Sequence, residues 1–160
     1  MLEFKDSDVF VKLASIFTPM PAQINEITPD QYAFHENALH SLPFAQLIGM
    51  KLVNLQPDEA VISIEMRDDL RQPNGVLHGG VTATLIDTAM AFAVRTRLSM
   101  DESTATIDLT VHYVRPHIEG VITCTAKIVR AGKRIFTVSA EVHNGKDKLI
   151  ATALSTYTRV

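Results

Sequence analysis

The sequence predicts an α+β fold in which one antiparallel sheet wraps around a single long central helix. The first observation is residues 80–94, GVTATLIDTAMAFAV, an apolar segment in which Asp87 is the single charged side chain. A helix that is apolar nearly all the way round is a buried helix. The second observation is the period-two alternation of apolar and polar residues on both sides of this segment. Such alternation is typical of strands with one covered face.

From Lys51 onward the alternation predicts the strands one by one. The first runs through residues 60–66, ahead of the helix. Four more follow the helix in succession, at residues 105–113, 121–130, 136–142 and 149–157. Turn-forming residues separate these four strands, at 116–120, 131–133 and 144–145. One sheet curved around one helix is the economical arrangement, and its free edge invites pairing with a second copy.

Residues 1–47 are predicted to form an N-terminal helical extension to a domain of residues 48–160. Apolar residues at helical spacing predict a first helix that ends at Pro19: Val9, Phe10, Leu13 and Phe17. Pro29 is suited to a first-turn position and opens a second short helix that runs to about His40.

The composition is that of an ordinary globular protein, with 46% hydrophobic and 21% charged residues in a chain of 160. Fifteen basic and eighteen acidic side chains give a net charge of -3 without a basic run, so no nucleic-acid partner is expected. The single cysteine, Cys124, excludes an intramolecular disulfide framework and favours a reducing cytoplasm. No apolar run approaches the roughly 20 residues that span a bilayer, so no membrane association is expected.

The chemistry is expected where the central helix begins. A carboxylate such as Asp87 inside an apolar helix needs hydrogen-bond partners, because an unpaired buried charge is costly. A glycine-rich approach, Asn74 to Gly80, carries His78 up to the helix start, whose free N–H groups suit an oxyanion. The carboxylate can attack a carbonyl or deprotonate a water, with Gln72 and His78 to orient it. Together these parts predict hydrolysis of an activated acyl group. The chain shows no convincing metal-ligand spacing, and no metal or cofactor is expected.

The spacing along the helix favours a site made by two subunits. Gly80 and Asp87 are seven residues apart, on one helix face and about 10 Å apart along the axis. One small reacting group does not reach both. If both act on one substrate, they come from different subunits, which predicts a dimer with two equivalent composite sites.

The stretch from Gln72 to Met90, QPNGVLHGGVTATLIDTAM, resembles the signature of hotdog-fold acyl-CoA thioesterases of the PaaI type, the phenylacetate-pathway branch. The likeness continues through residues 106–116, Gly120, residues 131–133 and residues 149–157, and leaves the N-terminal extension largely outside. It implies a hotdog fold, in which the antiparallel sheet wraps one long central helix, and a thioester hydrolase.

The resemblance also implies catalytic roles. Asp87 matches the nucleophile or general base, Gly79 the residue whose N–H polarises the thioester carbonyl, and His78 a histidine that supports the loop. Gln72 matches a position that orients the thioester or water, although Gln with Asp87 mixes the patterns of two subgroups. Thr106 aligns with a hydroxyl that assists the water in some members. From the alternation alone, Thr106 is interpreted as an ordinary sheet threonine on a polar face.

The implied substrate is a coenzyme A thioester whose pantetheine arm enters between the subunits of a homodimer or homotetramer (a dimer of dimers). Six residues are predicted to bind it, the basic ones at the nucleotide phosphates: Asn74, Gly80, Arg115, Arg130, Lys133 and Arg134. The acyl group stays open between aromatic, medium-chain and longer aliphatic classes, with a contribution expected from the N-terminal extension.

Three alternatives remain. A hotdog hydratase or dehydratase would act on acyl thioesters without releasing free CoA thiol. A non-catalytic hotdog protein would bind acyl-CoA and regulate another process. In a purely structural interpretation Asp87 is a packing acid, and its replacement by Asn leaves the activity of the preparation unchanged.

Overall fold

The structure is a computed structural model that describes residues 26–160. Its elements follow one another along the chain as α2 (Pro29–Ser41), α3 (Pro43–Ile48), β1 (Lys51–Gln56), β2 (Glu59–Glu65), a 3₁₀ turn (Asp68–Leu70), α4 (Gly79–Arg95), β3 (Thr104–Tyr113), β4 (Val121–Ala131), β5 (Ile135–Asn144) and β6 (Leu149–Arg159). The helix expected to end at Pro19 lies outside the described residues.

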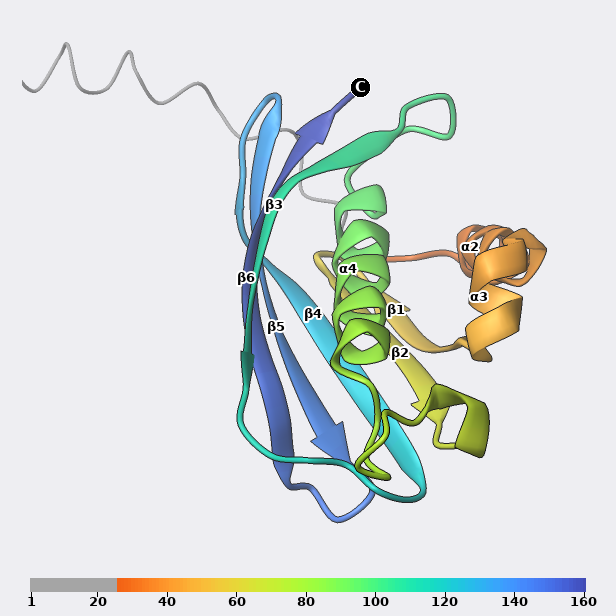
Figure 1. The fold of residues 1–160 in the computed structure, drawn as a ribbon. Coiled ribbons are helices and arrows are strands. Elements are labelled where there is room, and N and C mark those ends of the chain that lie inside the picture. Colours follow the sequence, from red (N-terminus) through yellow and green to blue (C-terminus); the bar gives the residue numbers. More distant parts are fainter. Residues whose placement is uncertain (1–25) are drawn as a thin grey trace, which may run out of the picture.

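All six strands form one antiparallel sheet in the order β1-β2-β4-β5-β6-β3. The sheet curves around α4, while α2 and α3 lie on the helix side of the molecule (Figure 1). The predicted sheet around one central helix, with an N-terminal helical extension, is confirmed. The chain leaves α4 to form β3 at the far edge, so β3 pairs with β6 on one side only.

The hydrophobic core lies between α4 and the inner face of the sheet. Fully buried residues of α4 include Leu85, Ile86 and Met90, and Cys124 of β4 is fully buried as well. Burial raises the pKa of the Cys124 thiol to about 12, so this thiol is a packing group. The other side of α4 is less covered, and its half-buried residues include Val81, Ala83, Thr84, Asp87, Thr88 and Ala91. The sequence predicts a helix that is buried on all sides, but in a single chain only the face of α4 toward the sheet is fully buried.

The N-terminal extension is built from two short helices. Thr28 caps α2, and its hydroxyl and the Gln31 side chain form a reciprocal capping box ahead of the predicted helix start at Pro29. A second proline, Pro43, opens α3, a short helix that the sequence analysis did not predict. Leu39 of α2 is 0% exposed, so the extension is packed into the core. No helix in the part of the chain described is long and apolar enough to cross a membrane.

Candidate active site

The N-terminus of α4 is capped by the histidine that precedes it. His78 has extended backbone angles, and its Nδ1 accepts the Gly80 N–H at 2.9 Å. A Cβ at position 80 would lie 3.0 Å from that ring nitrogen, so the cap depends on glycine there. His78 therefore caps the helix start, and the Gly80 N–H is already engaged within the chain.

Gly79 keeps its N–H free. Among residues 26–160 this N–H has no hydrogen-bond partner, as is usual for the first turn of a helix. The neighbouring carbonyl is occupied, because the Tyr113 hydroxyl donates to Gly79 O at 2.9 Å. The tyrosine ring would lie 3.4 Å from a Cβ at position 79. A donor at the positive end of α4 is thus held beside an aromatic side chain from β3.

A cavity of about 480 Å³ opens on the outer face of the sheet, and a smaller one of about 310 Å³ opens at the start of α4. The smaller cavity is lined by Gln72, Gly79 and Arg115, which the sequence predicted, and by Tyr113 and His117, which it did not. His117 is buried: its carbonyl accepts the Leu77 N–H at 2.8 Å, and its Nε2 lies 3.1 Å from Gly120 O. It therefore holds the loop before α4, a role that depends on contacts between distant segments.

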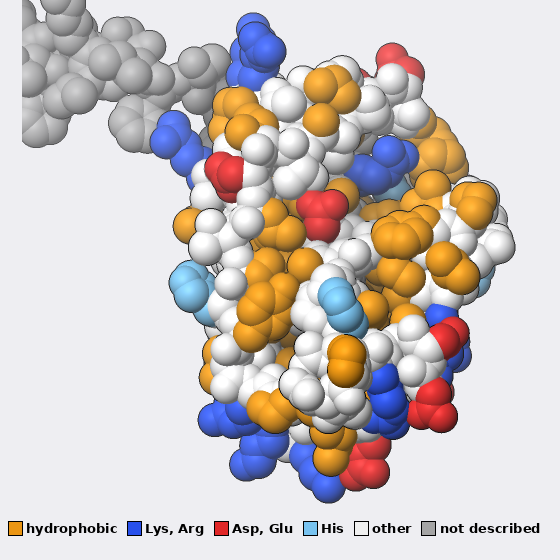
Figure 2. Space-filling view, in the orientation of Figure 1, with side chains coloured by type: hydrophobic (Ala, Val, Ile, Leu, Met, Phe, Trp, Pro, Cys, Tyr) orange, Lys and Arg blue, Asp and Glu red, His pale blue; other side chains and the backbone are white. Residues whose placement is uncertain are grey.

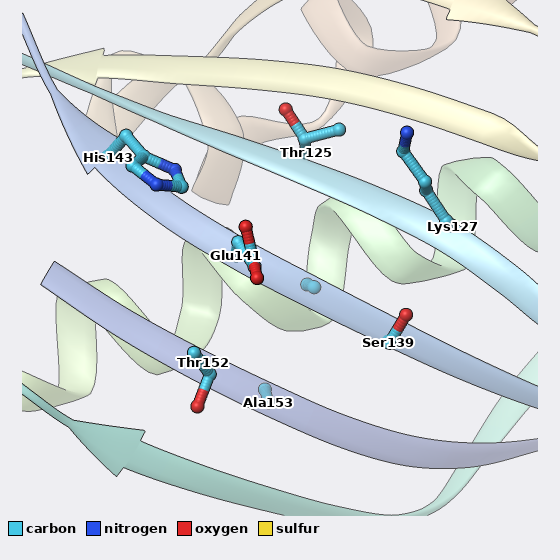
Figure 3. Close-up of a pocket in the computed structure, with 8 residues that line it drawn as sticks. Thr125, Lys127, Ser139, Glu141, His143, Thr152 and Ala153 are labelled. Atoms are coloured by element: carbon cyan, nitrogen blue, oxygen red, sulfur yellow. The ribbon is translucent and has the colours of Figure 1, made fainter. Parts of the chain in front are cut away.

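The larger cavity holds none of the predicted residues. Figure 3 shows its polar side chains rising from β4, β5 and β6, with α4 behind the sheet. They include Lys127, Glu141 and His143. This face points away from the helix that carries the predicted chemistry.

Asp87 is half-buried, and its two carboxylate oxygens differ. Its Oδ1 accepts two hydroxyl donors, Thr106 at 2.8 Å and Tyr157 at 2.7 Å. The Tyr157 hydroxyl also lies 2.8 Å from the backbone oxygen of Asp87. Within the described residues, Oδ2 has no hydrogen-bond partner. Tyr157 was included in the sequence analysis only in the stretch that resembles the family. A strand pattern does not predict that its hydroxyl contacts α4.

The interpretation of Thr106 as an ordinary threonine on a polar face is wrong, and a β-bulge is the reason. Strand β3 pairs Thr106 with Tyr157 but Asp108 with Thr156, so Ile107 is an extra residue. One extra residue reverses which side chains face the core. Thr106 therefore faces the helix together with Tyr157, whereas strict alternation assigned it to the outer face with Asp108.

The structure brings some predicted residues together and separates others. Gly79 and Asp87 lie eight residues apart on α4, about 12 Å along its axis, and the cavity at the helix start does not reach Asp87. Asn74 is exposed in the preceding turn and does not line that cavity. Three predicted basic residues lie exposed around the β4–β5 turn, at the end of the sheet away from the start of α4 (Figure 1): Arg130, Lys133 and Arg134.

Comparison with known proteins agrees with this architecture. Residues 74–151 match the sequence profile of the thioesterase superfamily. The medium/long-chain acyl-CoA thioesterase YigI of Escherichia coli is 28% identical, over 76% of this chain and 88% of its own. The conserved protein PA5202 of Pseudomonas aeruginosa is 30% identical, with a TM-score of 0.73 over 77% of this chain and 98% of its own.

A variant of the phenylacetic acid degradation protein PaaI from Thermus thermophilus is 32% identical, with a TM-score of 0.69 over 74% of this chain and all of its own. The sheet wrapped around α4 is thus a hotdog fold, as the motif from Gln72 to Met90 implied. The chain belongs to the thioesterase superfamily, a family of thioester hydrolases.

Proposed function

We propose that the protein hydrolyses acyl-CoA thioesters to a free acid and CoA, at sites shared between two subunits. The observation that carries the proposal is the Asp87 carboxylate, with Oδ1 held by two hydroxyls and Oδ2 free among the described residues. The same helix offers the free N–H of Gly79 at its start. A fixed carboxylate and a fixed backbone donor are the two parts that acyl transfer requires.

An edge strand supports the dimer. Strand β3 ends the sheet on one side, is ten residues long and exposes Ile107 and Tyr113 at 55% each. A long apolar edge is a liability unless another chain covers it. Figure 2 shows apolar side chains gathered beside β3 and over α2 and α3 on the same face. Two β3 strands paired about a two-fold axis would continue the sheet and set the two α4 helices antiparallel.

In such a dimer each α4 start faces the middle of the other α4. The Gly79 N–H of one protomer then polarises the thioester carbonyl, and Asp87 of the partner subunit acts on the carbonyl carbon. Either Oδ2 attacks that carbon, or it takes a proton from the water that does. When water attacks, Asp87 takes its proton, a C–O bond forms as the C–S bond breaks, and the leaving CoA thiolate takes up a proton. When Oδ2 attacks, CoA leaves in the same way, and water then hydrolyses the mixed anhydride on Asp87, which releases the acid and restores the carboxylate. The Gln72 side chain, in the same cavity as Gly79, orients the thioester or the water.

The two ends of each protomer also supply basic side chains for the phosphates of coenzyme A. Arg115 lines the cavity at the helix start, where its Nη1 donates to Leu149 O at 2.7 Å. The exposed basic residues around the β4–β5 turn lie at the opposite end of the same protomer. A two-fold axis would bring opposite ends of two protomers together, which supports a role for these side chains at the nucleotide phosphates.

The acyl group is proposed to be aliphatic, with aromatic esters as the comparison. YigI, 28% identical, carries the name of a medium/long-chain thioesterase. The N-terminal extension adds exposed apolar side chains on the helix side of the molecule, Leu42, Phe44 and Leu47. Apolar surface of this kind is suited to cover an alkyl chain.

The test is free-thiol release from a panel of acyl-CoA esters, with wild type beside Asp87→Asn. We expect turnover that falls by roughly two orders of magnitude or more in Asp87→Asn, because the amide is neither a base nor a nucleophile. Asp101→Asn, an exposed acid outside the site, is the matched control and should keep wild-type turnover. Wild-type protein that is folded and binds CoA yet releases no thiol would instead favour the hydratase or the regulatory alternative.

A further inference from the structure

We infer that Tyr157 is a positioning residue for the Asp87 carboxylate, which it holds so that Oδ2 is the oxygen that reacts. The inference rests on the proposed thioester hydrolysis, and it adds a residue of β6 to a site otherwise built from α4, its preceding loop and β3. The contact that carries it is the Tyr157 hydroxyl, 2.7 Å from Asp87 Oδ1.

Tyr157 is well suited to hold another group still, because its own ring is fixed. The side chain is 0% exposed and is among the largest fully buried ones of the core. The inward positions before it on β6 are small, Ala151, Ala153 and Ser155, so the Tyr157 ring is much larger than the β6 side chains that precede it on this face. A packed aromatic ring has two rotatable bonds, and its hydroxyl is therefore delivered to one place.

The hydroxyl pair selects one carboxylate oxygen over the other. Thr106 and Tyr157 both donate to Oδ1, which occupies the two lone pairs of that oxygen. Oδ2 accepts no hydrogen bond from the described residues. A carboxylate held at one oxygen by two donors cannot rotate freely, so Oδ2 keeps one direction toward the substrate.

The tyrosine hydroxyl also has a second acceptor, the backbone oxygen of Asp87 at 2.8 Å. One proton serves both, and the charged carboxylate is the stronger acceptor. When the carboxylate is neutralised by a proton or by an acyl group, the hydroxyl can donate to the backbone oxygen instead. The buried donor thus keeps a partner in each state of the cycle, which avoids the cost of an unsatisfied buried group.

The tyrosine itself stays neutral. Burial is the main reason that its pKa lies far above the ordinary value, and the hydrogen bond to Asp87 and the charge of that residue act in the same direction. Other titratable groups are few around this contact. The inward faces of β2, β4 and β5 carry apolar side chains and Cys124, while the Asp108 carboxylate on β3 accepts the Thr156 N–H.

The experiment compares wild type with Tyr157→Phe, which removes the hydroxyl and keeps the ring. We expect kcat to fall by roughly tenfold to a hundredfold with KM within about twofold, because the carboxylate loses its fixed direction but the substrate contacts remain. Tyr32→Phe, which removes a tyrosine hydroxyl from α2, should change neither of these quantities.

A carbon-13 spectrum of the Asp87 carboxyl at fixed pH, assigned with Asp87→Asn, gives the same comparison without turnover. Its chemical shift should change in Tyr157→Phe, because Oδ1 loses one of its two hydrogen-bond donors. An active wild type, an inactive Asp87→Asn and a Tyr157→Phe variant with wild-type kcat and KM would overturn this inference and leave the proposed function standing. Thiol release that does not depend on Asp87 would instead overturn the proposed function, and an unchanged carboxyl chemical shift would then reject the inference independently.

Discussion

At the scale of single residues, the backbone N–H of Gly79 is the group whose role can be isolated most cleanly. His78 already has φ -64 and ψ 131, an extended conformation that the residue before a proline prefers. Proline is also accepted at the first position of a helix, where its missing N–H breaks no helical bond. Gly79→Pro therefore removes the donor while the fold around it can persist, and Gly79→Ala adds a Cβ but keeps the donor.

We expect Gly79→Pro to lower kcat by roughly 10²- to 10³-fold, the usual effect of losing one oxyanion donor. Gly79→Ala should retain most of the activity, because its Cβ would meet the Tyr113 ring at an ordinary contact distance of 3.4 Å. Steady-state kinetics on the preferred ester, with circular dichroism to check folding, give the comparison. Equal losses in the two variants would show that space at position 79, and not the N–H, is what matters.

The residues of the helix start were predictable because they act through local sequence. Gln72, His78 and Gly79 lie within one loop and one helix turn, so their spacing alone indicated a common place. Tyr157 was not predictable in the same way, since its hydroxyl meets Asp87 across seventy residues of chain. A strand pattern predicts which face a side chain occupies but not which atom of a helix it contacts.

At the scale of elements, the bulge in β3 determines that Thr106 faces Asp87. Alternation predicted five of the six strands and missed β1, and it runs straight through Ile107, so it assigned Thr106 to the wrong face. Two hydrogen bonds link the bulge to β6. The Ser155 hydroxyl donates to Asp108 O at 2.5 Å, and Asp108 Oδ1 accepts the Thr156 N–H at 3.0 Å. Hydrogen bonds from side chains to the backbone at a bulge leave no period-two pattern in the sequence, so the alternation does not predict them.

Loosening the bulge should therefore impair catalysis from outside the site. Asp108→Ala loses the acceptor for the Thr156 N–H, and we expect several-fold lower kcat together with faster hydrogen exchange at that amide. Asp108→Asn keeps an oxygen in the same place and should remain close to wild type in both. If Asp108→Ala exchanges faster at Thr156 but turns over normally, the bulge is not what holds Thr106 against Asp87.

At the scale of the whole molecule, the proposed dimer makes each chain the carrier of two half-sites. The Gly79 donor lies at one end of α4, and the Asp87 carboxylate lies about 12 Å further along the same axis. The half-open face of α4 and the exposed edge of β3 both lie where a second copy would cover them. Helix geometry predicts the distance between Gly79 and Asp87 from the sequence. The proposed pairing of two β3 edges depends instead on the surface of the folded protein, which the sequence pattern does not define.

Subunit complementation tests the shared site most directly. Gly79→Pro and Asp87→Asn are each expected to be inactive, and a mixed dimer of the two has one doubly altered site and one intact site. After subunit exchange at equal amounts, random pairing should restore about one quarter of wild-type thiol release. Mixing that restores no activity, with mixed dimers demonstrated by mass spectrometry, would contradict the account, because donor and carboxylate would then act within one chain.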